Sequence, residues 1–305
     1  MPLPLPAEFQ RTITDVFGAD GERWLENFPA LIDQLAKRWS LRLLPPYNLS
    51  YNYVAPAVRE DGTPVVLKVG VPNVELISEM TALRHYNGHG MVRLIDSDED
   101  AGAMLLERIT PGVPLAEIKD DEMTTRIATE VMKRYFIPAP PDPDGKLRTA
   151  EGWSRGLQRL RREFNSGTGP YPQRAVEQAE RYVEEILAAS GPPMLLHGDL
   201  HHWNILSSER DGWLVLDPKG VVGEAEMEIC QWMMNLWPEK AEPAALRSQA
   251  ARRIAIFHEM LGWDEQRLWM HTLIRAVISS WWTYEDHKRV DTRGIAFIEA
   301  VASER

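Results

Sequence analysis

The sequence has one cysteine, no excess of basic residues and no long apolar run. Cys230 has no second cysteine to pair with, so an intramolecular disulfide is excluded and a reducing compartment is favoured. Lysine and arginine number 34 against 45 aspartate and glutamate residues, which gives a formal charge of −11. Proteins that bind nucleic acid or anionic lipid normally present a basic surface. We therefore expect neither partner, whereas an acidic protein suits a cationic small-molecule substrate.

No segment is typical of export or of membrane insertion. The chain begins Met-Pro-Leu-Pro-Leu-Pro, without the basic region and apolar stretch of a signal peptide. The longest apolar candidate, Leu273 to Trp282, is interrupted by Arg275 and two serines, and is shorter than the roughly 20 residues that cross a bilayer. We expect a cytoplasmic protein, and the sequence predicts no oligomeric state.

The first third of the chain combines short strand patterns with helices. Apolar residues between Trp24 and Trp39 recur at helical spacing, which predicts a helix over about residues 21–39 with a kink at Pro29. A second helix is expected over Val74–Tyr86. Turn signals such as Asp61-Gly62 separate five expected strands: Leu41–Leu44, Tyr51–Val58, Pro64–Val69, Met91–Asp96 and Ala103–Glu107.

Beyond the segment Arg108–Gly112, which is typical of a connector, the pattern is mostly helical. The expected helices are Asp120–Tyr135, Gly152–Phe164, Arg174–Ala189, Ala244–Leu261 and Asp264–Asp286. The sequence therefore predicts an α+β fold in two lobes. Residues 1–108 form a small strand-rich lobe that binds the nucleotide, and residues 109–305 form a larger helical lobe for catalysis and substrate. Ligands prefer the cleft between such lobes.

The segment His197-Gly-Asp-Leu-His-His-Trp-Asn204 carries the strongest chemical signal. Asp217 closes the next apolar run, 13 residues after Asn204. This order matches the H-x-D-x-x-x-x-N catalytic loop of kinases and the acidic residue at the end of their next strand. Asp199 would orient an acceptor hydroxyl and take its proton, while Asn204 and Asp217 offer oxygen ligands to Mg²⁺. We predict an ATP-dependent phosphotransferase.

Two other interpretations of this loop are weaker. Asp199 and Asn204 could only hold a turn, but Asp217 stands where phosphoryl transfer needs a second acid. The spacing of His197 and His201 resembles a zinc-binding helix, yet the glutamate of that motif is missing and the intervening glycine disfavours a helix. We expect His197 and His202 to support the loop.

Lys68 lies in the alternating strand Val65–Val69, and Glu79 follows it on the helix expected over Val74–Tyr86. In kinases a lysine–glutamate pair of this kind holds the lysine against the α- and β-phosphates. A solvated lysine with a separate helix-face glutamate is the plain alternative. Glu75, one turn earlier on the same face, is the competing partner.

The segment that should cover the phosphates, Pro45–Asn52, contains no glycine. Kinases normally place glycines here so that backbone amides can approach the phosphates. Ser50 and Asn52 are the candidates for the turn and for the hydrogen-bond donors that it would need.

Taken together, these motifs resemble one known family. Leu196–Leu206 and Leu216-Asp-Pro-Lys-Gly-Val-Val-Gly-Glu224 are similar to the aminoglycoside/hydroxyurea antibiotic resistance kinases, as are Ala82–Leu94 and Leu105–Gly112. Asp-Pro-Lys-Gly is the most discriminating part, and the resemblance runs from about Tyr47 to the C-terminus. It implies a protein-kinase-like fold with an antiparallel sheet and one key helix in the small lobe. It also implies ATP with Mg²⁺, and transfer of the γ-phosphate to a hydroxyl.

The resemblance further assigns individual roles. It makes Asp199 the base, Asn204 and Asp217 the metal ligands, and Lys68 with Glu79 the phosphate clamp. The backbone from Glu107 to Ile109 would receive adenine. Met227-Glu228 stands where the family tends to have a Tyr-Asp pair, a departure on the substrate side.

Carboxylates interleaved with indoles near the end of the chain suit a guanidinium or ammonium sugar, through charge-assisted hydrogen bonds and cation–π contacts. The substrate candidates are Glu224, Glu228, Asn235, Trp282, Glu285 and Asp286, whereas Trp281 continues an apolar stripe and fits the core. We favour an aminoglycoside or amino-sugar acceptor of the streptomycin type. A kinase of hydroxyurea-like compounds or another small alcohol, and a catalytically silent nucleotide-binding protein, are the alternatives.

Overall fold

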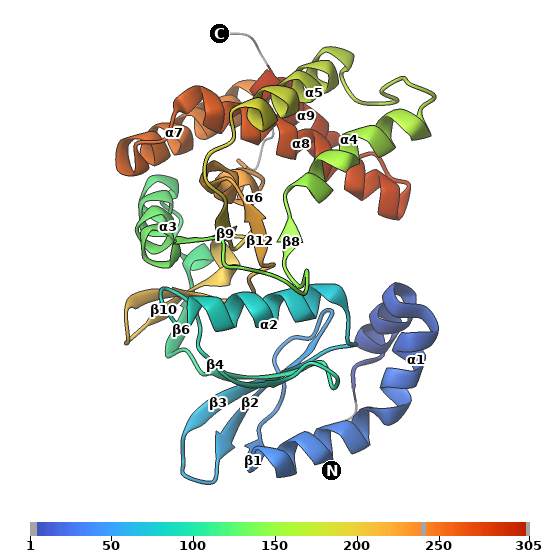
Figure 1. Ribbon diagram of the computed structural model, residues 1–305, viewed down its shortest axis with the longest axis vertical. Coiled ribbons are helices and arrows are strands. Elements are labelled where there is room, and N and C mark those ends of the chain that lie inside the picture. The colour runs from blue at the N-terminus through green and yellow to red at the C-terminus, as the bar shows by residue number, and fades with distance from the viewer. Residues whose placement is uncertain (1–4, 239–241, 303–305) are drawn as a thin grey trace.

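The computed structural model describes residues 5–238 and 242–302, without the side chains of residues 151–154. An antiparallel sheet and the helix above it form one lobe, and helices with two small sheets form the other (Figure 1). The predicted α+β architecture is confirmed. No helix in the described ranges is both long and apolar enough to span a membrane.

The sheet of the small lobe has five strands in the order β1-β2-β3-β5-β4, all antiparallel. The strands are β1 (Leu41–Leu43), β2 (Tyr53–Arg59), β3 (Pro64–Val69), β4 (Leu94–Asp98) and β5 (Ala103–Glu107). The expected strand at Met91 begins three residues later, at Leu94. The reason is that Val92 N–H bonds the carbonyl of Val215 in the other lobe at 2.7 Å.

Helix α1 (Ala7–Arg38) covers one face of this sheet, and Phe28 packs edge-on against Tyr53 of β2. The predicted helix is present but begins 14 residues earlier than expected. The residue with non-helical dihedral angles inside α1 is Gly18, at φ 55° and ψ −132°, while the kink or restart expected at Pro29 stays a prediction. Glycine adopts positive φ without a Cβ clash, so the chain bends there.

Helix α2 (Val74–Tyr86) lies between the sheet and the helical lobe (Figure 1). Asn73 caps it by accepting hydrogen bonds from the N–H groups of Glu75 and Leu76. Met80 and Tyr86 of α2 belong to the same hydrophobic core as Tyr135 and Leu195 of the helical lobe. The two lobes therefore share one core through α2, which fixes the height of this helix above β3.

The five helices predicted for the second lobe are all present with ends within one residue of expectation. They are α3 (Asp121–Tyr135), α4 (Glu151–Glu163), α5 (Gln173–Ala188), α7 (Pro243–Leu261) and α8 (Glu265–His287). The sequence did not predict α6 (Ile229–Met233) or α9 (Thr292–Ala302) as helices. Trp281 is buried in the core, as expected.

Two small sheets position the loops between the lobes. The first runs β11-β10-β6, made of β6 (Pro111–Pro114), β10 (Ile205–Ser208) and β11 (Gly212–Val215). The second runs β7-β9-β12-β8, made of β7 (Ile137–Pro138), β8 (Arg148–Thr149), β9 (Met194–Leu196) and β12 (Val221–Gly223). Three 3₁₀ turns complete the described elements: η1 (Leu115–Glu117), η2 (His202–Asn204) and η3 (Ala225–Glu228). The division at residue 108 stays a prediction.

Candidate active site

The segment His197–Asn204 forms the loop between β9 and β10, and a buried histidine holds its shape. Nδ1 of His197 accepts a hydrogen bond from Asp199 N–H at 3.1 Å, and Nε2 lies 2.8 Å from the carbonyl oxygen of Leu216. Burial lowers the pKa of His197 to about 3, so the ring stays neutral and Nε2 donates. Gly198 is required at φ 77°, because a Cβ there would lie 2.5 Å from Val221.

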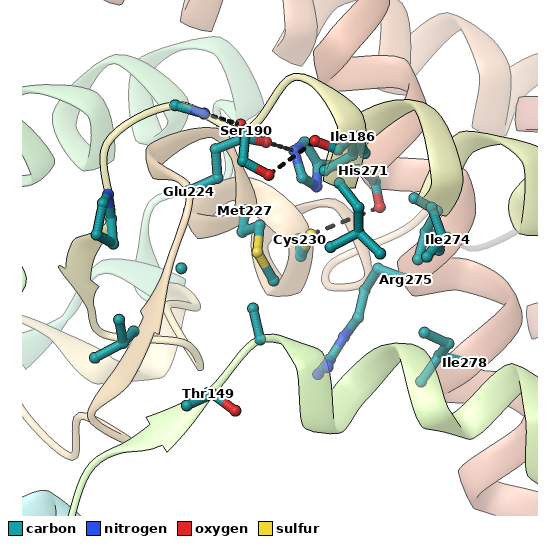
Figure 2. Close-up of a pocket in the computed structure, with 17 residues that line it drawn as sticks. Thr149, Ile186, Ser190, Glu224, Met227, Cys230, His271, Ile274, Arg275 and Ile278 are labelled. Carbon is teal, nitrogen blue, oxygen red and sulfur yellow. Dashed lines mark hydrogen bonds and ion pairs between the residues drawn. The ribbon is translucent and has the colours of Figure 1, made fainter.

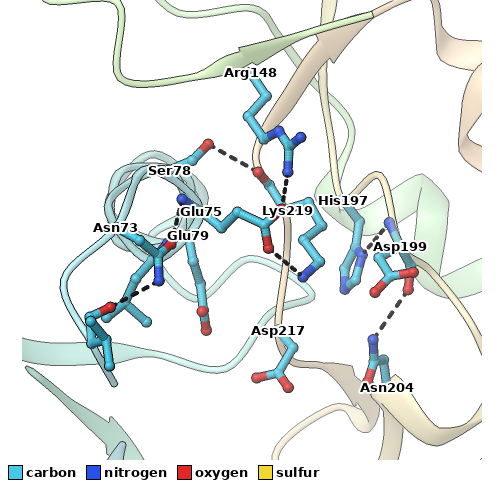
Figure 3. Close-up of polar contacts among 12 residues, drawn as sticks. Asn73, Glu75, Ser78, Glu79, Arg148, His197, Asp199, Asn204, Asp217 and Lys219 are labelled. Carbon is cyan, nitrogen blue, oxygen red and sulfur yellow. Dashed lines mark hydrogen bonds and ion pairs between the residues drawn. The ribbon is translucent and has the colours of Figure 1, made fainter. Parts of the chain in front are cut away.

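Asp199 and Asn204 are tied to each other across this loop. Nδ2 of Asn204 donates to the carbonyl oxygen of Asp199 at 3.1 Å, which leaves its amide oxygen for another partner (Figure 3). Burial raises the pKa of the Asp199 carboxyl above its ordinary value. A carboxylate with a raised pKa accepts a proton more readily than an exposed one.

Lys68, Glu79 and Asp217 meet at the interface of the two lobes. Nζ of Lys68 lies 2.7 Å and 2.8 Å from the two carboxylate oxygens of Glu79, and 2.9 Å from Oδ1 of Asp217. Burial opposes a charge on Lys68, but the two carboxylates outweigh it and raise the lysine pKa. Burial would raise the pKa of Asp217, yet the Lys68 charge holds it below the ordinary value. Burial raises the pKa of Glu79 to about 7, and the Lys68 charge opposes that rise.

His202 and Glu228 lie behind the catalytic loop. The His202 ring stacks on Trp232 with 3.6 Å between centroids. Glu228 is 1% exposed, and its carboxylate accepts hydrogen bonds from the N–H groups of His197 at 2.7 Å and Gly198 at 3.1 Å. This corrects the expectation that Glu228 faces the substrate. Burial raises its pKa to about 7, and the two N–H donors oppose that rise.

A cleft of about 330 Å³ opens beside Asp199. Three of the expected substrate residues on α8, namely Trp282, Glu285 and Asp286, line this cleft. Its remaining walls carry charges of both signs and come from α2, β8, α4, the catalytic loop, the segment that enters β12, and α8 itself: Glu75, Arg148, Arg159, Gly198, Lys219, Val221 and Arg275.

The basic residues of the cleft were missed by sequence reasoning, and they change its charge. Nε of Arg159 lies 2.7 Å from Glu285, so this carboxylate is already neutralised. Arg148 bonds Glu75, and Arg275 lies over the Trp282 ring at 5.0 Å. No motif marks these arginines, since each comes from a separate helix or strand. The prediction of a strongly acidic substrate side is therefore too simple.

Besides Glu228, two expected substrate residues do not line this cleft. Glu224 lines a separate cavity of about 370 Å³ (Figure 2), where it bonds Arg267, the Gly191 N–H at 2.8 Å and His271 at 2.9 Å. Asn235 donates to the Gln231 carbonyl at 2.8 Å within the chain segment after α6. Glu224 and Asn235 therefore stabilise the structure around the cleft and do not form its wall.

The expected nucleotide contacts are partly committed to other partners. The Glu107 N–H donates to the Arg93 carbonyl at 3.0 Å, and its carboxylate binds Arg210 at 2.6 Å. In the described part of the chain the N–H groups of Arg108, Ile109 and Thr110 make no hydrogen bond, so the adenine contact expected at Glu107 to Ile109 stays a prediction. Ser50 and Asn52 lie in the β1–β2 loop, next to β3.

The zinc alternative finds no support in the described ranges, where no three His, Cys, Asp or Glu side chains come together as a metal site. Mg²⁺ requires fewer protein ligands, because it is commonly held by one or two protein oxygens together with substrate phosphates. The free amide oxygen of Asn204 and the half-exposed Asp217 carboxylate are hard donors of this kind. The residues present therefore fit Mg²⁺.

The sequence was compared with known families and proteins. The family described as aminoglycoside/hydroxyurea antibiotic resistance kinase matches residues 46–287. Streptomycin 6-kinase of Streptomyces glaucescens is 30% identical over 287 residues, covering 94% of this chain and 91% of that protein. Hydroxyurea phosphotransferase of Kitasatospora aureofaciens is 30% identical over 287 residues, covering 92% and 81%.

Solved structures support the fold. A thermostable mutant of aminoglycoside phosphotransferase APH(4)-Ia, in a ternary complex with ADP and hygromycin B, matches with a TM-score of 0.60 at 16% identity. That match covers 89% of this chain and 99% of the other. Macrolide 2'-phosphotransferase MphH from Brachybacterium faecium matches with a TM-score of 0.56 at 18% identity, covering 92% and 100%.

Proposed function

Because this chain belongs to the aminoglycoside/hydroxyurea antibiotic resistance kinase family, we propose that it transfers the γ-phosphate of ATP to a hydroxyl of an aminoglycoside or amino sugar. It is a phosphotransferase with a kinase-like fold. The observation that carries the proposal is the convergence of Asp199, Asn204 and Asp217 (Figure 3), with Asp199 in the wall of a cleft of about 330 Å³.

The chemistry assigns one task to each group. Asp199 orients the acceptor hydroxyl and takes its proton as the oxygen attacks the γ-phosphorus. The bond from that phosphorus to the bridging oxygen breaks, and ADP leaves. The raised pKa of Asp199 favours this proton transfer. Lys68, fixed by Glu79 at 2.7 Å, is placed to hold the α- and β-phosphates.

Asn204 and Asp217 would hold Mg²⁺, which when bound neutralises charge on the phosphate oxygens. Asp217 uses one oxygen for Lys68 at 2.9 Å, so its other oxygen remains for the metal. We place the reaction in the cytoplasm, where ATP is supplied.

Asp286 and Trp282 are the features that favour a cationic acceptor. Asp286 is exposed at the cleft, and in the described part of the chain its carboxylate forms no hydrogen bond. A guanidinium or ammonium group would gain a charge-assisted hydrogen bond there and could lie against the indole. Streptomycin-type aminoglycosides carry such groups.

Hydroxyurea-like compounds are the second candidate acceptors. The specific observation is the neutralisation of Glu285 by Arg159, which leaves a cleft of balanced charge that also accepts a small neutral molecule. The 30% identity to a hydroxyurea phosphotransferase points the same way. Both acceptors require the same base and the same nucleotide site.

The test is a phosphorylation assay with ATP and Mg²⁺ over streptomycin, other aminoglycosides, hydroxyurea and choline, with ³¹P NMR of the product to locate the phosphate. We expect turnover with a cationic sugar. Turnover with hydroxyurea alone would favour the second candidate. If ATP is consumed with none of these acceptors, the proposed acceptor class is wrong.

A further inference from the structure

Lys219 lies where the catalytic loop, α2 and the acceptor cleft meet. Its N–H donates to the His197 carbonyl at 2.7 Å, and its own carbonyl accepts from the Ser78 hydroxyl at 2.9 Å. A Cβ added to Gly198 would lie 3.6 Å from Cβ of Lys219. The backbone of this lysine is therefore fixed against both the catalytic loop and α2.

The side chain of Lys219, by contrast, is held weakly. Nζ lies 3.3 Å from the Glu75 carboxylate, and the two side chains are 40% and 50% exposed (Figure 3). Exposed pairs of this length contribute little and exchange readily. Lys68 differs, since it is 5% exposed and bonds three carboxylate oxygens. Lys219 can leave its partner, whereas Lys68 cannot do so at low cost.

The charge of Lys219 reaches the reacting groups. Burial is the largest influence on the pKa of both Asp199 and Asp217, and the Lys219 charge acts on both in the opposite direction, lowering the pKa. The Lys219 ammonium group therefore interacts electrostatically with both the base, Asp199, and the predicted metal ligand, Asp217. The transferred phosphoryl group must pass between these two carboxylates.

Phosphoryl transfer needs cations aimed at the equatorial oxygens of the moving group. The two loops expected to surround the phosphoryl group, Pro45–Asn52 and His197–Asn204, contain no lysine or arginine and so supply no such cation. The three arginines of the cleft are engaged elsewhere: Arg148 with Glu75, Arg159 with Glu285, and Arg275 with Gln231. Among the cations of the cleft, Lys219 is therefore the one that lies next to the catalytic loop and is held weakly enough to move to the phosphoryl group.

We infer that Lys219 is a further catalytic residue, which exchanges Glu75 for the γ-phosphate and stabilises the phosphoryl group during transfer. This inference rests on the proposed function. Lys219 donates hydrogen bonds to the equatorial oxygens and neither gives nor takes a proton in the reaction. The new bond joins the acceptor oxygen to phosphorus, the bridging bond to ADP breaks, and the proton goes to Asp199.

The experiment compares Lys219→Met, Lys219→Arg and Glu75→Gln with Arg84→Met as the matched control. Arg84 also forms an exposed pair on α2, with Glu99, and its side chain is 43% exposed. Four quantities are measured with Mg²⁺: acceptor turnover, slow ATP hydrolysis, ADP affinity, and affinity for ADP with aluminium fluoride, which mimics the transferring group. Thermal unfolding accompanies each variant.

We expect Lys219→Met to lower turnover and ATP hydrolysis by about 10²-fold, and to weaken ADP–aluminium fluoride binding by a similar factor. ADP affinity should stay within about threefold, because ADP lacks the group that Lys219 contacts. Lys219→Arg should restore part of the loss. Glu75→Gln should keep turnover within a few-fold, and Arg84→Met should match the wild type.

The inference is overturned if Lys219→Met retains turnover within about threefold of the wild type. It is also overturned if ADP and ADP–aluminium fluoride binding weaken equally while the protein unfolds at lower temperature, the signature of a structural tie between lobes. If the wild type phosphorylates no tested acceptor, the proposed acceptor class fails, while ATP hydrolysis and fluoride binding still decide the role of Lys219. A wild type that neither hydrolyses ATP nor binds ADP–aluminium fluoride overturns both.

Discussion

The nucleotide side and the acceptor side of the site meet at Asp199, but they are held by different kinds of contact. Lys68 and Glu79 are less than 10% exposed and bond at 2.7 Å, and two segments with recognisable motifs supply them. Glu285 is 30% exposed, Asp286 is more exposed still, and Arg159, the partner of Glu285, comes from a helix with no motif. Buried charges without partners are costly, so the first set is constrained in identity and spacing. Half-exposed charged residues can be substituted at lower cost. The acceptor can therefore differ between relatives.

The largest expected effect tests the point shared by both sides. Asp199→Asn keeps the shape of the side chain but removes the base, so turnover should fall by roughly 10²–10⁴-fold. Affinity for ATP should stay nearly unchanged, because the hydrogen bond between Asp199 and Asn204 is made by the Asp199 backbone carbonyl, which the substitution keeps. Steady-state kinetics and calorimetry on the same preparation measure both quantities. Full activity in this variant would remove Asp199 from the mechanism.

The next largest effect concerns Glu228, which supports the catalytic loop from behind. Glu228→Gln replaces a carboxylate that accepts from two N–H groups, at 2.7 and 3.1 Å, by an amide with one acceptor oxygen. The loop should shift slightly, and turnover should fall by about 10–10²-fold with little change in KM for ATP. The same variant of Glu226, a neighbouring half-buried acid, is the control. An unchanged turnover would show that the loop holds its shape without this carboxylate.

Glu228 also gives a pH signature of known sign. Its folded pKa, about 7, lies above the ordinary 4.5, so the folded state binds a proton more tightly than the unfolded chain. Stability from this group is full below about pH 4.5 and is lost as pH rises through 7, by up to about 3 kcal/mol. The unfolding free energy of Glu228→Gln, relative to the wild type, should therefore rise between pH 5 and pH 8. Urea titrations at both pH values measure it, and a difference that stays constant would contradict the shift.

A smaller effect is expected on the acceptor side. Asp286→Asn should raise KM for a guanidinium-bearing acceptor by about tenfold with kcat nearly constant, because the contact is made equally in ground and transition states. Hydroxyurea turnover should not change. Glu184→Gln, an exposed acid on α5 outside the cleft, is the control. Equal KM values for the wild type and Asp286→Asn would move the cationic subsite elsewhere.

The same contrast explains how far sequence reasoning reached. Asp199, Asn204 and Asp217 are spaced by the chemistry that they perform, and the segment Val74–Tyr86 shows helical periodicity, so all could be located without coordinates. Glu228 could not be placed, because a carboxylate that bonds backbone N–H groups leaves no mark in composition. The signal that existed was its apolar surroundings, Met227 and Ile229, which favour a buried position.

The arginines of the cleft could not be predicted from the sequence for another reason. Arg148 and Arg159 reach the cleft through the pairing of β8 with β12 and the packing of α4 against α8, and periodicity does not report which elements pack together. Gly18 illustrates a related limit in α1. A proline inside a helix is the stronger kink signal in a sequence, yet the residue with non-helical dihedral angles is the glycine, which tolerates positive φ.

The smallest effect concerns the glycine-free loop Pro45–Asn52 on the nucleotide side. A Cβ at Gly70 would lie 2.1 Å from Oδ1 of Asn52, so Gly70→Ala must displace that side chain. If Asn52 donates to a phosphate, both Gly70→Ala and Asn52→Ala should raise KM for ATP by about three- to tenfold. The double variant should be no worse than either single one, because both remove the same contact. AMP affinity is the internal control, since AMP lacks the β- and γ-phosphates. Additive losses, or a loss shared by AMP, would show that Asn52 shapes the strand rather than the phosphate site.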